Sequence, residues 1–149
     1  MGLPVDSVDL RQVEANKFFE TADPLYCVSY LGPALKQSTL DAIVEKFVPI
    51  DNGFFHVRQS ISDEQMKKLF EKCVLSNKTV TIWAIPNDFT KIFDSRGPID
   101  YSKYFSVKLI LREGKLVRFG NKEKDKLELQ VRLYELVEWS WSEPSRLIF

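Results

Sequence analysis

The chain has 149 residues, of which 44% are hydrophobic and 28% are charged, and its 21 basic residues balance its 21 acidic ones. This composition is typical of a folded domain and excludes a disordered or fibrous protein. The balance of charge gives no overall preference for a nucleic acid or a membrane. Two cysteines, Cys27 and Cys73, are too few for a disulfide framework or a closed zinc site. We therefore expect one globular domain over residues 1–149, with no cofactor and no metal.

The beginning of the sequence gives an expectation about location. The stretch MGLPVDSVDL has neither a basic region nor an apolar run, so it does not have the pattern of a signal peptide. No run of about 18 apolar residues is present, so no helix is expected to cross a membrane. These features predict a soluble cytoplasmic protein.

Strand-like segments recur through the first two thirds of the chain. Residues 25–31, 54–61 and 79–85 have the apolar and aromatic content of strands, and each is bounded by turn residues. The segment before Leu25 is ambiguous. Residues 86–103 predict an irregular loop with one helical turn near Phe89.

Two helices are expected between these strands. Ser62 and Gln65 have the spacing of a capping box and start a helix within residues 62–77. Its apolar stripe has the periodicity of a helix face that packs on a core, and it consists of Met66, Leu69, Phe70, Cys73 and Val74. A second helix within residues 37–49 is predicted to use Ser38 as its N-cap.

The last third predicts an antiparallel meander with strands at 105–111, 115–120 and 127–142. A two-residue turn at Glu113-Gly114 would place Leu109 opposite Arg118. A three-residue loop would instead pair Leu109 with Phe119, and we favour it because it matches apolar faces. The expected fold is α+β, a mixed sheet with two helices on one face and a C-terminal antiparallel meander.

Glu135 interrupts the apolar side of the last segment. The odd-numbered residues from Leu127 to Trp141 are otherwise apolar, as in a strand with one buried face. A straight strand of this length would span about 50 Å, whereas a domain of this size is about 40 Å across. We expect Glu135 to mark a bend or bulge. A buried general acid is the alternative, and a helix from Lys126 to Glu138 is another.

No complete catalytic set is present in the sequence. His56 is the only histidine and lies within a predicted strand, where a half-buried structural role is the expectation. A pairing of Cys27 with His56 is conceivable on adjacent strands, although nothing marks Cys27 as a reactive thiol. The glycines form no phosphate-binding motif. An enzyme is therefore the third of the functions that we consider.

The segment 101–126 has a local excess of positive charge beside aromatic residues. This pattern is typical of a hairpin that contacts a nucleic acid backbone and stacks bases, although charged hairpins are more often plain surface. The candidate nucleic-acid-binding residues are Lys108, Arg112, Lys115, Arg118, Lys122, Lys124, Lys126 and Phe119.

The stretches KLILREGKLVRF and RLYELVEW…SRLIF, about a quarter of the chain, resemble the C-terminal half of small accessory subunits of type III CRISPR effector complexes. The resemblance implies a subunit of a nucleoprotein assembly and carries over no binding or catalytic residues.

Our leading hypothesis is a non-enzymatic binding module that docks onto a larger protein or nucleoprotein assembly. Its positive support is the aromatic terminus with Trp139, Trp141 and Phe149 as candidate interface residues, for which a place in the core is the competing interpretation. Binding of single-stranded RNA or DNA through the hairpin at 101–126 is the alternative function. Neither hypothesis involves a membrane.

Overall fold

The computed structural model describes residues 12–21, 24–123 and 125–144. The elements follow one another in this order: α1 Gln12–Thr21, β1 Cys27–Tyr30, α2 Gln37–Lys46, β2 Phe54–Ile61, α3 Asp63–Ser76, β3 Thr81–Pro86, the 3₁₀ turns η1 Phe89–Lys91 and η2 Tyr101–Lys103, β4 Val107–Arg112, β5 Leu116–Gly120, β6 Glu128–Leu133 and β7 Val137–Ser142.

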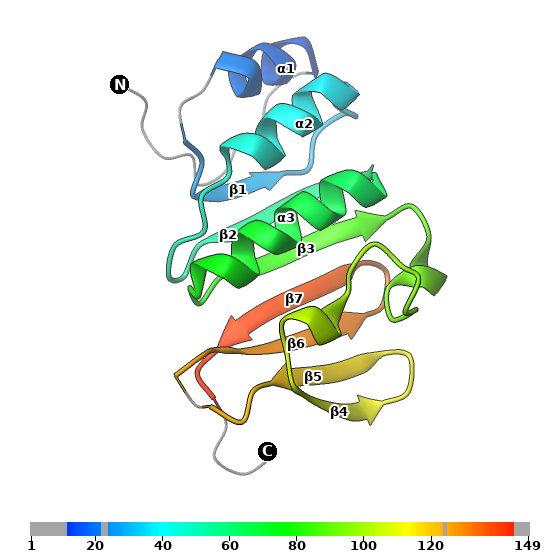
Figure 1. Cartoon of the computed structure of the whole chain (residues 1–149). Helices are drawn as coiled ribbons and strands as arrows, with labels where there is room; N and C mark the ends of the chain where they lie inside the picture. Colours follow the sequence, from blue (N-terminus) through cyan, green and yellow to red (C-terminus); the bar gives the residue numbers. More distant parts are fainter. Residues whose placement is uncertain (1–11, 22–23, 124, 145–149) are drawn as a thin grey trace.

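Seven strands form one mixed sheet in the order β1-β2-β3-β7-β6-β5-β4 (Figure 1). The first three strands are parallel and are linked by α2 and α3. The last four form an antiparallel meander, whose final strand β7 pairs with β3 and joins the two halves. The α+β fold with a mixed sheet and a C-terminal meander is therefore confirmed.

The helices α2 and α3 lie on the same side of the sheet (Figure 1). A third helix, α1, was not predicted and packs against α2. There the Thr39 hydroxyl donates a hydrogen bond to Asn16 Oδ1 at 2.6 Å, and Lys46 Nζ donates to the Phe19 carbonyl at 2.9 Å. These contacts supply the tertiary support that so short a helix needs.

The two predicted helix starts have different outcomes. Ser62 caps α3 as expected, because its side chain accepts from the Gln65 N–H while the Gln65 side chain accepts from the Ser62 N–H. The assignment of Ser38 as a cap is wrong. The cap position of α2 is Lys36, which makes no side-chain cap bond, and Ser38 lies inside the helix.

The core lies between α3 and the middle of the sheet. Phe70 makes ring contacts with Trp139 at 5.0 Å and with Trp141 at 5.6 Å between centroids. The irregular segment between β3 and β4 covers the meander half of the same face, where the Tyr101 ring stacks on Phe119 at 4.4 Å. This segment takes the place that a third sheet-covering helix would occupy (Figure 1).

The β4–β5 hairpin corrects the predicted register. Leu109 pairs with Arg118, not with Phe119, although the tip does contain a three-residue loop between Arg112 and Leu116. The three-residue loop and the observed register are compatible because the pairing shifts at Leu111. A bulge there inserts one extra residue into β4. The prediction failed because it assumed a buried face for β4, an edge strand whose apolar residues are largely exposed.

The segment from Leu127 to Ser142 is two strands, not one. β6 and β7 pair in an antiparallel hairpin, and Tyr134, Glu135 and Leu136 connect them. Glu135 is exposed in this turn. Glu135 therefore lies in a bend, as expected, but this bend reverses the chain between two strands instead of curving one strand. The buried acid and the helix are contradicted.

Candidate functional site

One face of the sheet carries α2 and α3 (Figure 1). Within the described residues no helix covers the opposite face, and we call this the open face. Side chains alternate between the two faces of a strand, and residues directly opposite each other across a ladder share a face. Trp139 points toward α3, so its neighbour Glu138 points to the open face, together with its partners Trp83 and Arg132. The same rule places His56 there.

A groove of about 770 Å³ opens where the β4–β5 and β6–β7 turns meet η1. We call it the hairpin-end groove. It is lined by Phe89, Arg112, Gly114, Lys115, Leu116, Arg132, Leu133 and Tyr134. Three of these residues are cations, two are aromatic and none carries a carboxylate. Such a lining favours an anion with planar groups.

The three cations of the groove have acidic neighbours but no close ion-pair partner among the described residues. Within the described residues, Arg112, Lys115 and Arg132 form no ion pair. Two acids, Glu113 and Glu135, occupy the adjoining turns but do not line the groove. The local potential therefore depends on three positive groups inside and on three nearby acids, which are Glu113 and Glu135 in the adjoining turns and Glu138 opposite Arg132.

Tyr134 is an aromatic wall of this groove and is half exposed. Its hydroxyl donates to Glu138 Oε1 at 3.2 Å. Partial burial, followed by the neighbouring Glu138 carboxylate, raises the pKa of Tyr134, so the phenol stays neutral at physiological pH. The ring can therefore stack against a planar group without adding negative charge.

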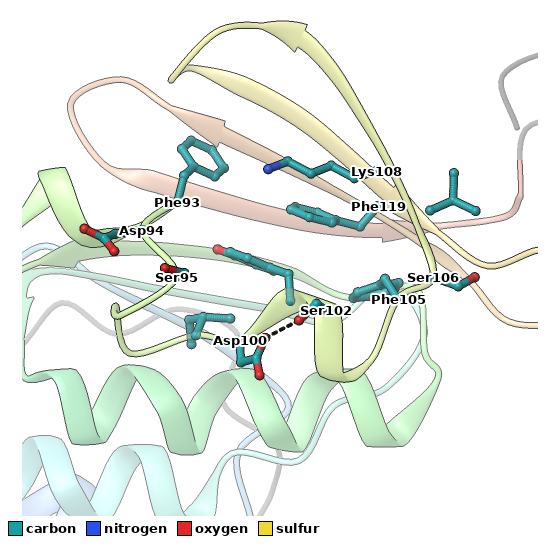
Figure 2. Close-up of a pocket in the computed structure, with 12 residues that line it drawn as sticks. Phe93, Asp94, Ser95, Asp100, Ser102, Phe105, Ser106, Lys108 and Phe119 are labelled. Atoms are coloured by element: carbon teal, nitrogen blue, oxygen red, sulfur yellow. Dashed lines mark hydrogen bonds between the residues drawn. The ribbon is translucent and has the colours of Figure 1, made fainter.

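The predicted hairpin cations do not form one patch. Lys108 lies on the helix-covered side, where its chain passes over the Phe119 ring toward Phe93 in a separate hollow of about 270 Å³ (Figure 2). Arg118 is on the open face but lies 3.8 Å from the Glu128 carboxylate. Of the predicted cations that the structure describes, only Arg112 and Lys115 lie in the groove.

Two of the remaining hairpin cations lie at the far end of the meander. Lys122 and Lys126 belong to the loop between β5 and β6, about 17 Å from the groove along β5. Lys124 is outside the described residues. A ligand of a few nucleotides therefore does not contact both groups at once.

The predicted aromatic contacts are mostly buried. Phe119 is stacked under Tyr101 in the core. Trp139 and Trp141 are 0% and 3% exposed, so neither indole has a surface for a partner, and the competing interpretation as core residues holds. Phe149 is outside the described residues.

The residues considered for catalysis are separated. His56 is half-buried in β2, as expected, and faces Ser29 of β1, whereas Cys27 faces Phe54. Burial, and then the nearby Arg58, lowers the pKa of His56. Cys73 is buried, and burial raises the pKa of its thiol. The strand register therefore does not pair Cys27 with His56, and the residue opposite His56 is Ser29.

The described residues lack two further features. No three histidine, cysteine or acidic side chains lie close enough together to hold a metal ion. No helix there combines the length and the apolar character that crossing a membrane requires.

Sequence reasoning missed three groove residues: Arg132, Tyr134 and Phe89. The predicted strand over residues 127–142 contains Arg132 and Tyr134. An arginine on the polar side of a strand does not indicate a binding site. The hairpin between β6 and β7 brings them next to the β4–β5 turn. A turn predicted at Glu135 would have allowed this.

Comparison with known proteins gives no further assignment for this site. No protein-family model, no curated protein and no solved structure matches the chain. The resemblance of the C-terminal strands to accessory subunits of type III CRISPR complexes stays a prediction.

Proposed function

We propose that this protein is a non-enzymatic binding module that docks onto a nucleoprotein assembly by holding a single strand of nucleic acid in the hairpin-end groove. The observation that carries the proposal is the lining of this groove. Arg112, Lys115 and Arg132 line it together with Phe89 and Tyr134, and no carboxylate does.

The chemistry of the lining fits phosphates and bases. Arginine presents planar donors that match a phosphate, and lysine adds a point charge. Contact with phosphates releases condensed counterions, which gives sequence-independent affinity. An exposed aromatic ring such as Tyr134 stacks on a base of any kind. A single strand is favoured over a duplex, because the bases of a duplex are already stacked inside it.

Two properties of the chain bear on how the groove binds its partner. The protein has no net charge, so binding depends on local potential rather than on a basic surface. The resemblance to subunits of nucleoprotein complexes favours the same class of partner.

A matched pair of triple variants tests the proposal. Reversing Arg112, Lys115 and Arg132 to Glu should abolish binding of a fluorescent ten-nucleotide single-stranded RNA or DNA at about 50 mM salt. The control reverses Lys68, Lys122 and Lys126 to Glu, which changes the net charge by the same amount away from the groove, and it should retain most of the affinity. Equal losses in the two variants would contradict a localised site, and no binding by wild type would refute the proposal.

A protein partner on the β4 edge is the second candidate. β4 is the outermost strand of the meander, and Ile110 and Leu111 are each 45% exposed on it. An open edge with apolar side chains can accept a strand from another protein. Proteins that co-purify with the untagged wild type and are lost from the double variant Ile110→Glu, Leu111→Glu would support this candidate. Their retention by the variant would exclude the edge.

A further inference from the structure

A transverse row of side chains on the open face leads away from the hairpin-end groove. Strand pairing aligns one residue from each of six adjacent strands, from β4 to β2: Arg112, Leu116, Arg132, Glu138, Trp83 and His56. At about 4.8 Å between strands the row is about 24 Å long. Its first three members line the groove, so the groove and the row form one continuous surface.

The far end of the row is aromatic. His56 and Trp83 have ring centroids 5.7 Å apart, and Phe54 contacts Trp83 edge-on at 6.4 Å. All three side chains are half-buried on the face that no described helix covers. They therefore keep part of their ring surface accessible, whereas Trp139 and Trp141 do not.

Glu138 connects the two ends and fixes the orientation of Trp83. One of its oxygens, Oε1, accepts from the Trp83 indole N–H at 3.1 Å and from the Tyr134 hydroxyl at 3.2 Å. The Trp83 indole is therefore held in place before any partner binds, which reduces the entropy lost on binding. The same carboxylate directly faces Arg132 across the ladder, so its charge is partly balanced.

Given the proposed function of the groove, we infer that the single strand continues along this row and that its bases stack on Trp83 and His56. Arg132 and Trp83 are two strand spacings apart, about 10 Å, so a chain whose phosphates are held at Arg132 can place a neighbouring base on Trp83. Cations at one end and aromatic rings at the other match a polymer that carries both phosphates and bases. A protein partner would gain little from the charged centre of the row, where Arg132 and Glu138 would have to lose water.

His56 is suited to this role near neutral pH. Its pKa is lowered by burial and by Arg58, so the ring is neutral there. Besides Arg58, the nearest charged groups in the row are Glu138 and Arg132, across β3. A neutral imidazole stacks on a base without depending on salt.

An abasic oligonucleotide separates stacking from phosphate binding. The probes are a ten-nucleotide single-stranded DNA and a ten-unit abasic strand with the same phosphates. We expect wild type to bind the normal strand at least about tenfold more tightly, the value of one stacked base. Binding should also quench tryptophan fluorescence, since Trp83 is half-buried whereas the other two tryptophans, which also lie in the described residues, are buried.

Variants at Trp83 complete the test. Trp83→Ala should lose the quenching and most of the preference for the normal strand, whereas Trp83→Phe keeps a ring and should retain the preference. Leu75→Ala, an exposed residue on α3, should behave as wild type.

The possible failures are distinct. If wild type binds both probes equally and the groove variant still binds neither, base stacking on the row and on Tyr134 is wrong, and the phosphate contacts of the groove stand. If wild type binds neither probe at about 50 mM salt, the groove and the row are both wrong.

Discussion

Replacing Phe70 with alanine should be the most damaging single truncation in α3. The side chain is buried and contacts four other aromatic rings, with centroid distances of 5.4 Å to Tyr101, 5.9 Å to Tyr104, 5.0 Å to Trp139 and 5.6 Å to Trp141. A buried Phe→Ala change costs about 3–5 kcal/mol, because the transfer energy is lost and a cavity is left. The free energy of unfolding of a native domain is about 5–15 kcal/mol. The variant should therefore still fold, but it should unfold at a much lower urea concentration.

The assay is urea unfolding followed by tryptophan fluorescence. Leu75→Ala is the matched control, because it also truncates an apolar residue of α3, but one that is 74% exposed. Its cost should stay within about 0.5 kcal/mol. Phe70→Leu should fall between the two. If Phe70→Ala and Leu75→Ala lowered the free energy of unfolding equally, the packing of α3 on the sheet would be wrong.

Three further predictions concern single residues. Ser62→Ala should lower the free energy of unfolding by about 0.5–2 kcal/mol because it removes a cap, whereas Ser38→Ala should change it little; equal effects would contradict the helix starts. Glu135→Gln should leave urea unfolding unchanged at both pH 5 and pH 8, because Glu135 is exposed; a gain confined to pH 8 would indicate a buried acid. For His56, the folded pKa is lowered, so the unfolded chain binds the proton more readily and stability should fall as the pH drops through about 6.5. His56→Gln should flatten that decline, and a wild-type stability that rose on acidification over the same range would contradict it.

The sequence predicted well those features that depend on local pattern. The capping box at Ser62 and the apolar stripe that includes Phe70 specify α3 without reference to the rest of the chain. The alternation of strands and helices, followed by a meander, also predicted the mixed sheet. These patterns depend on residues that are close together in the sequence, and the corresponding elements are present in the structure.

Features that depend on long-range contacts could not be predicted in the same way. The apolar alternation around Glu135 is the same for one bent strand as for a hairpin, since the turn preserves which side faces the core. The register at Leu109 depends on the position of β4 at the sheet edge, which the sequence does not specify. The groove was the hardest feature to predict, because Arg132 and Tyr134 reach it only through the chain reversal between β6 and β7.

The salt dependence of single-strand binding tests the central claim most directly. If Arg112, Lys115 and Arg132 each contact one phosphate, the logarithm of the binding constant should fall with the logarithm of salt concentration with a slope of about −2. Reversal of these three residues should remove both the binding and the slope, while the control reversal of Lys68, Lys122 and Lys126 should leave a slope near −2. A wild-type slope near zero, or the same slope in the groove variant, would contradict the account.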